Sequence, residues 1–368
     1  ETQWPLAGVS ARAMLRRLVD EVFKWLPWTP TMQVALLSVE YDTADETQRE
    51  QFLEDFRSRI QLTYRSGLST PLSLDGGKEI TSDSGWGCML RVTQMMLAQC
   101  FVSMTLGRAW RYQAARDLAE GSAYKEIISC FLDVPKAPFS LHNFVHGGQR
   151  LLGKEPSAWF GPTSAARVVG HLCDSLAKGD ACDGTEAPSF LKGVACVAFE
   201  DGAIFKSLVL EKFAQGAGAV ILLVCRRLGL ESFNVTEYRA GIEQCFKLPE
   251  FQGLASGNNS TSAHFFVGTH DDCLVFLDPH RTLPALESVD AITGESGLLP
   301  PRPLPLRWAS LNPSICAAFL VRSPEDFAGL CAKLSEGALG EVFEVLEKVP
   351  SYASPAEEAT DDDMVLLG

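Results

Sequence analysis

The stretch that decides the fold of this chain is Thr81-Ser82-Asp83-Ser84-Gly85-Trp86-Gly87-Cys88-Met89-Leu90-Arg91. The residues before Cys88 are rich in Ser, Asp and Gly, which favour turns. After Cys88, apolar side chains recur at helical spacing, and no Gly or Pro follows before Gly107. The sequence therefore predicts a turn that delivers Cys88 to the first turn of a helix.

A cysteine in the first turn of a helix can become a nucleophile. Unpaired backbone N–H groups and the helix macrodipole favour negative charge there, which lowers the thiol pKa from its usual value of about 8.5. Gly85 and Gly87 leave room for a backbone to approach, and Trp86 between them could form the wall of a narrow slot. The alternative is that Cys88, one of eleven cysteines, is a buried structural residue.

A nucleophilic thiol needs a base, and His280 is the best placed of the six histidines. Residues 273–277 form a continuous apolar run typical of a buried strand, and they lead directly into Asp278-Pro279-His280. In an extended segment, residues two apart project to the same side, so Asp278 and His280 are expected to face one site. The aspartate would then orient the imidazole and stabilise its protonated form. A solvated turn at the end of a strand is the alternative.

Further motifs run through most of the chain and share one order with a known family. They are Leu62-Thr63-Tyr64-Arg65, the stretch from Thr81 to Arg91, Gln94 to Gln99, Ser140-Leu141-His142, Trp159-Phe160-Gly161-Pro162, Arg227-Leu228-Gly229-Leu230, Ser262 to Gly268, and Leu277-Asp278-Pro279-His280. In this order the chain resembles the autophagins, cysteine proteases that process ubiquitin-like autophagy modifiers. The resemblance implies an α+β, papain-like cysteine protease fold with an antiparallel sheet and the nucleophile at a helix N-terminus.

The same resemblance implies a role for each matching site residue. Cys88 corresponds to the nucleophile, His280 to the general base and acid, and Asp278 to the residue that orients the histidine. Tyr64 corresponds to a tyrosine whose hydroxyl helps the Cys88 backbone N–H to hold the oxyanion, with a packed core tyrosine as the alternative. Trp159 corresponds to a tryptophan that covers the substrate entrance together with a mobile loop. The resemblance implies no cofactor and no metal.

The loop that would act with this tryptophan is the gate loop, which we define as Asn258, Asn259, Ser260, Thr261 and Ser262. Related proteases carry a proline where this chain has Ser260, and the polar run around it has more backbone freedom. We therefore expect the gate loop of this chain to close over the entrance in a different position from the loop of the related proteases. An ordinary loop beside a hairpin is the alternative.

The resemblance implies cleavage of a ubiquitin-like autophagy modifier after its C-terminal glycine. This reaction would first mature the precursor and later release the modifier from phosphatidylethanolamine on autophagic membranes, with transient membrane contact. A slot between Trp86 and Trp159 would suit such a thin peptide end. Two alternatives remain, namely a catalytically weak module that binds the modifier and a protease for another ubiquitin-like protein. The spacing of residues alone predicts only a cysteine hydrolase.

Composition limits the setting in which the protein works. The formal charge of −14 and the pI near 5.0 argue against a nucleic-acid partner. The odd number of cysteines and the absence of a C-x-x-C pair favour a reducing compartment over a disulfide framework or a zinc ribbon. No apolar run reaches membrane-spanning length and no signal peptide is visible, so we expect a cytoplasmic protein.

The chain is expected to contain one large protease body. We predict an N-terminal extension at 1–45 with an amphipathic helix, a papain-like body at 46–349, and an acidic, disordered tail at 350–368. The amphipathic helix could touch a membrane that holds lipidated substrate, although packing on the body is favoured. The tail could dock the modifier by strand addition, although it has no aromatic anchor.

One set of residues has the spacing of metal ligands. His142 and His146 are four residues apart, and His171 with Cys173 could complete a set. No Glu follows His142 to act as a base, and Gly147-Gly148 is expected to end the helix early. The sequence therefore argues against a metal centre here.

Overall fold

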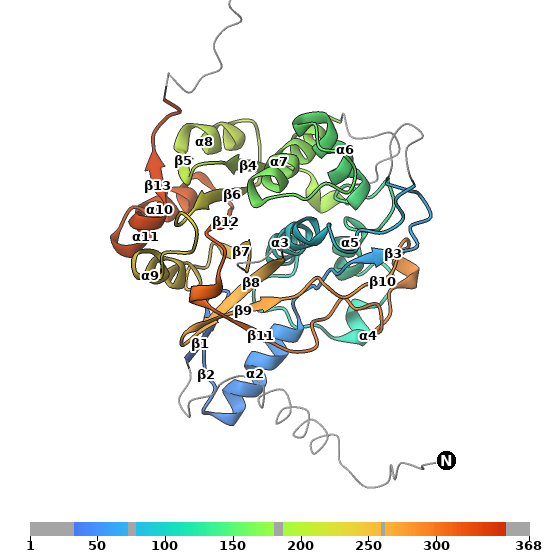
Figure 1. Ribbon diagram of the computed structural model, residues 1–368, viewed down its shortest axis with the longest axis horizontal. Coiled ribbons are helices and arrows are strands. Elements are labelled where there is room, and N and C mark those ends of the chain that lie inside the picture. The colour runs from blue at the N-terminus through green and yellow to red at the C-terminus, as the bar shows by residue number, and fades with distance from the viewer. Residues whose placement is uncertain (1–32, 73–78, 180–186, 259–261, 351–368) are drawn as a thin grey trace, which may run out of the picture.

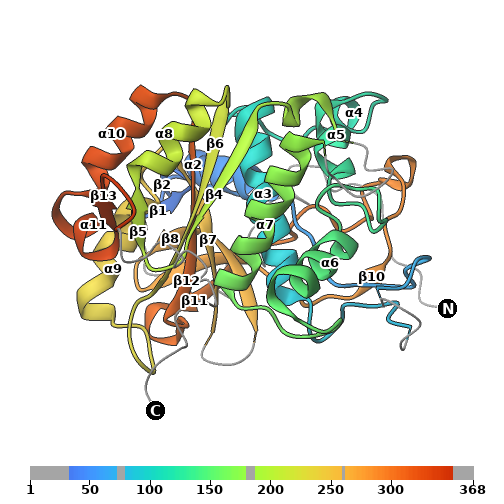
Figure 2. The same ribbon diagram turned by 90° about the horizontal axis from the view of Figure 1, so that it is seen from above.

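The computed structural model describes residues 33–72, 79–179, 187–258 and 262–350 (Figure 1). These residues form an α+β architecture in which one large, mostly antiparallel sheet lies between two layers of helices. Seen from above, the sheet runs through the middle of the molecule, with α3 and α7 on one side and α10 and α11 on the other (Figure 2). The predicted fold class is therefore confirmed.

The large sheet has nine strands, seven of which follow the order β11-β9-β8-β7-β12-β6-β4, while β1 pairs with β8 and β2 pairs with β1. All neighbours are antiparallel except β4 and β6. Its strands are β1 (Gln33–Leu36), β2 (Val39–Asp42), β4 (Val194–Phe199), β6 (Ala219–Arg227), β7 (Phe251–Gly257), β8 (Ala263–His270), β9 (Cys273–Leu277), β11 (Leu304–Arg307) and β12 (Ser314–Val321). Two short parallel pairs lie apart from it, β3 (Arg65–Ser66) with β10 (Leu283–Pro284) and β5 (Ala203–Phe205) with β13 (Glu344–Leu346).

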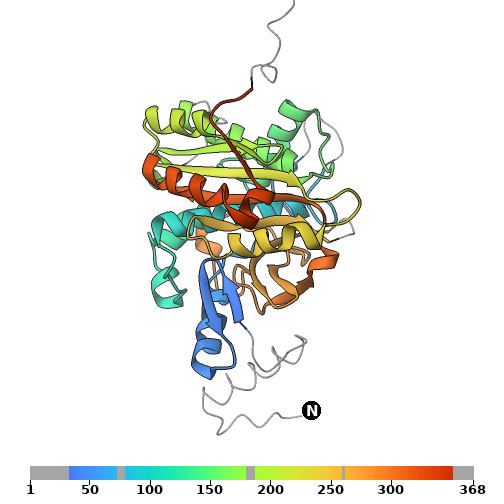
Figure 3. The ribbon, with the colours of Figure 1, turned by 90° about the vertical axis from the view of Figure 1, so that its left-hand side faces the viewer.

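Helices cover both faces of the sheet. Those described are α2 (Glu46–Arg57), α3 (Cys88–Thr105), α4 (Ala114–Asp117), α5 (Ala123–Ser129), α6 (Leu141–Leu152), α7 (Pro162–Lys178), α8 (Lys206–Ala214), α9 (Val235–Cys245), α10 (Pro324–Leu334) and α11 (Gly337–Val342). Figure 3 looks directly onto the layer of α9 to α11, with strands of the large sheet behind it.

The central strands are apolar on both faces because both faces are covered. In β6, Ile221 and Leu223 belong to the core shared with α3 and α7, whereas Val220 and Leu222 belong to the core shared with α9 to α11. Alternation of side chains along a strand sends successive residues to opposite faces. The continuous apolar run of β6 therefore contributes side chains to two cores, one on each face of the sheet.

The helix α3 is a buried platform for the residue at its start. It begins at Cys88, as the sequence predicts, and 16 of its 18 residues are buried. The helix also ends just before Gly107, the first glycine after Cys88. Gly107 terminates it by adopting a positive φ of 82°, and its N–H donates to the Val102 carbonyl at 2.9 Å. A helix that is enclosed on all sides holds its first residue in a fixed position.

The expectation that Gly147-Gly148 would end α6 was wrong. The helix continues through both glycines to Leu152 and ends at Gly153, which is left-handed with φ 60°. A Cβ on Gly147 would lie 2.8 Å from Val168, and one on Gly148 would overlap the Phe160 ring. These glycines therefore serve close packing against the next segment and not termination.

The predicted division of the chain stays a prediction. The predicted boundary at residue 45 separates β1 and β2 from the body, although β1 pairs with β8 in the large sheet. The apolar stripe from Met14 to Leu26, which predicts the amphipathic helix of the N-terminal extension, lies outside the described residues. So do most of the tail and residues 180–186. Among the residues that are described, no helix combines the length and the apolar character needed to cross a membrane.

Candidate active site

The turn before α3 is held by a buried ion-pair network. Arg91 Nε lies 2.8 Å from Asp83 Oδ2, and its Nη2 lies 2.9 Å from Asp133 Oδ1, with all three side chains at most 2% exposed. Asp83 also accepts the backbone N–H of Arg65 at 2.6 Å, and its carbonyl accepts that of Gly87 at 2.8 Å. A Cβ on Gly87 would lie 2.6 Å from Asp83 Cβ, so only glycine fits this turn. The network fixes the position from which the Cys88 thiol projects.

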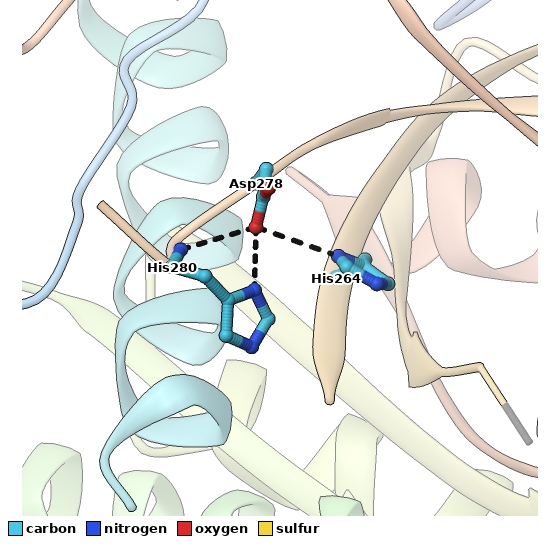
Figure 4. A group of neighbouring side chains, drawn as sticks. All are labelled: His264, Asp278 and His280. Atoms are coloured by element: carbon cyan, nitrogen blue, oxygen red, sulfur yellow. Dashed lines mark hydrogen bonds and ion pairs between the residues drawn. The ribbon is translucent and has the colours of Figure 1, made fainter. Parts of the chain in front are cut away.

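The residues after β9 form a compact hydrogen-bonded pair. Asp278 Oδ1 accepts the ring Nδ1–H of His280 at 2.5 Å and the His280 backbone N–H at 3.0 Å (Figure 4). Gln61 Nε2 donates to the Asp278 carbonyl at 2.7 Å, and the Tyr64 backbone N–H donates to the Pro279 carbonyl at 2.9 Å. The two side chains thus meet as the spacing predicts, and the segment that leads into β3 holds them in place.

The thiol of Cys88 contacts groups from three segments. Its side chain is hydrogen-bonded to His280 and to the Tyr64 hydroxyl, and it also receives a bond from the Ala263 backbone at the start of β8. Burial by itself raises the pKa of the Cys88 thiol, but these hydrogen bonds outweigh it and the pKa lies below the ordinary cysteine value. The structure therefore favours a thiolate at this position.

The pKa values of His280 and Asp278 are shifted in opposite directions, each toward the charged form. Burial lowers the pKa of His280, but the hydrogen bonds to Asp278 and Cys88 raise it to about 9. Burial raises the pKa of Asp278, but its hydrogen bonds with His280 hold it below the ordinary value. The pKa of Tyr64 is raised by burial and by the neighbouring thiolate, so its hydroxyl keeps its proton and can donate. The shifts in the pKa values of Cys88 and His280 both favour a thiolate and imidazolium pair over the neutral thiol and imidazole.

The activity is expected to have a bell-shaped pH profile with an alkaline limb near pH 9. The folded pKa of His280 is raised from 6.5 to about 9, so the imidazolium and its stabilisation are fully present below about 6.5 and are lost as the pH rises through about 9. The acid limb should lie below the ordinary thiol value because the pKa of Cys88 is lowered. Cleavage rates give the alkaline limb, and rates of Cys88 alkylation by iodoacetamide give the acid limb. An alkaline limb near the unperturbed histidine value would contradict this prediction.

The predicted entrance residues are only partly described. Trp159 is 48% exposed on the segment between α6 and α7, and its carbonyl accepts Lys154 Nζ at 3.0 Å. The two ends of the gate loop are bonded together, since Ser262 Oγ donates to Asn258 Oδ1 at 2.8 Å. Asn259, Ser260 and Thr261 lie outside the described residues. The gating roles of Trp159 and of the loop stay predictions.

The start of β8 contributes two groups that the sequence analysis gave no role. The backbone of Ala263 bonds to the Cys88 thiol, and the His264 ring faces the Asp278 carboxylate. Burial lowers the pKa of His264 to about 4, so its ring is neutral. The signal in the sequence was a histidine at the start of an apolar strand, in one of the motifs quoted above. Its spacing to Asp278 could not be read from the sequence.

One group of side chains offers ligand atoms to a metal. These atoms of His264, Asp278 and His280 all lie within 4.8 Å of one another, and no second such group occurs within the described ranges. In tetrahedral zinc sites with bonds of about 2 Å, ligand atoms are roughly 3.3 Å apart. The 2.5 Å separation between Asp278 and His280 is too short for both atoms to bind one ion. Asp278 and His280 form a hydrogen-bonded pair instead, with His264 beside it.

The histidines of α6 and their expected partners do not form a ligand set in the described residues. His142 is buried, and its Nε2 lies 2.8 Å from the Thr70 carbonyl. This contact accounts for a polar side chain in the core and needs no metal. His142 therefore holds the segment before residue 73 against the start of α6.

A low-pKa thiol at a helix N-terminus, beside an imidazole that a carboxylate orients, defines a thiol hydrolase. Residues 49–333 match the peptidase C54 catalytic domain. This chain belongs to the peptidase C54 family, whose members are cysteine peptidases with a papain-like fold.

Several similar proteins are named as cysteine proteases. The chain is 32% identical to cysteine protease ATG4B of Gallus gallus over 340 residues, which cover 84% of this chain and 83% of the relative. It is 31% identical to cysteine protease ATG4A of Pongo abelii over 338 residues, covering 84% and 81%. A third relative, named "Probable cysteine protease ATG4" in Pichia angusta, is 37% identical over 267 residues, and the match covers 67% of this chain but 49% of that protein. This chain thus spans about half the length of the third relative.

Proposed function

We propose that this protein is an autophagy cysteine endopeptidase that cleaves a ubiquitin-like modifier after its C-terminal glycine. It would mature the precursor and also release the modifier from phosphatidylethanolamine. The observation that carries the proposal is the contact of Cys88 with His280, and of His280 with Asp278, in a chain of the peptidase C54 family. The cysteine proteases named ATG4 among its relatives support the assignment to autophagy.

In the proposed reaction, the thiolate of Cys88 attacks the carbonyl carbon of the modifier's terminal glycine. The protonated ring of His280 gives its Nε2 proton to the leaving amine, which belongs either to the following residue or to phosphatidylethanolamine. This step leaves a thioester between Cys88 and the glycine. His280 then takes a proton from water, the hydroxide attacks the thioester, and the thiolate leaves. Asp278 keeps Nδ1 protonated in both steps.

The oxyanion of each tetrahedral intermediate would be held by two donors. One is the backbone N–H of Cys88, which lies in the first turn of α3, where backbone N–H groups point out of the end of the helix. The other is the Tyr64 hydroxyl, which keeps its proton and already bonds to the thiol. Such donors lose little free energy in reorganisation, because packing positions them before the substrate arrives.

A glycine at the cleavage point fits the surroundings of the thiol. Cys88 is only 2% exposed, and the indole Nε1 of Trp86, two residues before it, donates to the Ser82 carbonyl at 3.1 Å. A residue without a side chain reaches such a recessed atom with the least displacement. Contact with autophagic membranes would be transient, since only the lipid-linked form of the substrate requires it, and the enzyme would act from the cytoplasm.

The test is cleavage of a modifier precursor extended beyond its terminal glycine. We expect a product that ends at the glycine by mass spectrometry, release of the same modifier from phosphatidylethanolamine in vesicles, and no product with Cys88→Ala. A precursor with leucine in place of the terminal glycine should resist cleavage. Cleavage by the Cys88→Ala variant would overturn the proposed nucleophile.

The second candidate is a protease for another ubiquitin-like protein, because the same three residues would serve any such substrate. Ubiquitin carrying a C-terminal extension is the control that separates the two. Faster cleavage of this ubiquitin than of the modifier precursor would favour the second candidate.

A further inference from the structure

We propose that His264 is a positioning residue of this site, whose buried imidazole keeps the Asp278 carboxylate aligned with His280. The inference rests on the proposed function of Cys88, His280 and Asp278. His264 itself would not touch the substrate. It would act through Asp278, whose Oδ1 faces the rings of both His264 and His280 (Figure 4).

The ring of His264 is held rigidly. It is the second residue of β8, where it pairs with Ser256 of β7, and it is only 6% exposed. Its ring packs on Phe276 of β9 with the centroids 4.3 Å apart. Because β8 is bonded to both neighbouring strands, the imidazole can serve as a fixed reference for the irregular segment that follows β9.

The polar edge of this ring points at the carboxylate. Nδ1 of His264 lies 3.8 Å from Asp278 Oδ1, the same oxygen that accepts both bonds from His280. This Nδ1 is buried and has no hydrogen-bond partner, which is costly unless it serves a nearby charge. A carboxylate at this distance favours the tautomer of a neutral imidazole with its N–H directed toward the negative charge.

The Asp278 carboxylate could also rotate away from His280, toward a cavity with arginines in its wall. Asp278 also lines a cavity of about 210 Å³ whose wall includes Arg281 and Arg302. A carboxylate that rotated toward this wall would lose the bond to His280 Nδ1. The dipole of His264 attracts the carboxylate away from this cavity and toward the relay.

The His280 ring is also in direct contact with His264. Their centroids are 5.3 Å apart at 68°, an edge-to-face contact, and the Tyr64 ring makes a second such contact with His280 at 5.5 Å and 87°. His264 therefore limits the movement of both members of the pair. A misplacement of about 1 Å in such a relay can cost roughly 100-fold in rate.

The matched test compares His264→Leu with His264→Asn. Leucine keeps the apolar packing on Phe276 but removes the N–H, whereas asparagine places an amide N–H near the position of Nδ1. We expect His264→Leu to lower kcat roughly 10- to 100-fold with KM unchanged, and to slow Cys88 alkylation at neutral pH. His264→Asn should recover kcat to within about threefold of the native enzyme.

Several outcomes would overturn the inference. An unchanged kcat in His264→Leu would do so, and so would equal losses in the leucine and asparagine variants, or a change in KM alone. If His264→Leu does not fold, His264→Phe replaces it with the same expectations, because it keeps a ring of similar size. The Cys88→Ala variant is measured in parallel, so that a failure of the proposed nucleophile is recognised separately from a failure of His264.

Discussion

Replacing His280 with alanine is expected to lower kcat/KM by a factor on the order of 10⁴ or more. The imidazole holds the proton that the leaving amine needs, and its positive charge stabilises the thiolate of Cys88. Without it, the pKa of Cys88 should rise toward the ordinary thiol value, because burial of the thiol then acts with less opposition. Cleavage of the modifier precursor and alkylation of Cys88 by iodoacetamide measure the two effects separately.

The double variant provides the control for this prediction. Groups that act as one unit give losses that do not add, so Cys88→Ala with His280→Ala should be no worse than the more damaging single variant. Losses that multiplied in the double variant would mean that the two residues act independently. Asp278→Asn tests the third member, since it keeps the shape of the side chain but removes the charge that holds His280 protonated.

The replacement Arg91→Met is expected to destabilise the fold by about 3–5 kcal/mol. The two carboxylates that Arg91 contacts, Asp83 and Asp133, are at most 2% exposed and would be left buried without their cation. The turn before α3 would lose its main bond to the helix, so Cys88 alkylation should also slow. Urea unfolding followed by circular dichroism measures the loss in the free energy of unfolding.

The matched control for this change is Arg167→Met. Arg167 Nε lies 3.2 Å from Glu200 Oε1, but both side chains are about half exposed, at 48% and 50%. An exposed ion pair contributes at most about 1 kcal/mol, so the control should stay close to the native stability. A loss for Arg91→Met no larger than that of the control would show that the buried network does not hold the turn.

Local sequence patterns were sufficient for the elements that carry the proposed site. A polar, glycine-rich turn followed by apolar residues at helical spacing predicted α3 with Cys88 at its start, and the structure confirms this. The apolar run at 273–277 became β9 without a change of bounds. The meeting of Asp278 and His280 followed from the alternation of an extended chain. Each of these features depends on residues that are neighbours along the chain.

Patterns failed where the decisive contact was between distant segments. Gly147-Gly148 was expected to stop a helix, but the close approach of Phe160 and Val168 gives these glycines a packing role inside it. His280 was expected to serve Cys88 because of its place at a strand end, and the family resemblance implied the same pairing, but neither segment contains information about the distance between them.

The sequence by itself determined the local structure of this protein, the residue types available for thiol chemistry and, through its motifs, the peptidase C54 family. Only the tertiary structure decided which groups surround the thiol, since the Ala263 backbone and the His264 ring reach the site through the pairing of β8 with β7 and β9. The physical reason is that helix and strand patterns depend on short-range periodicity. The pKa values of Cys88 and His280 depend instead on burial and on hydrogen bonds that form only when distant segments pack together.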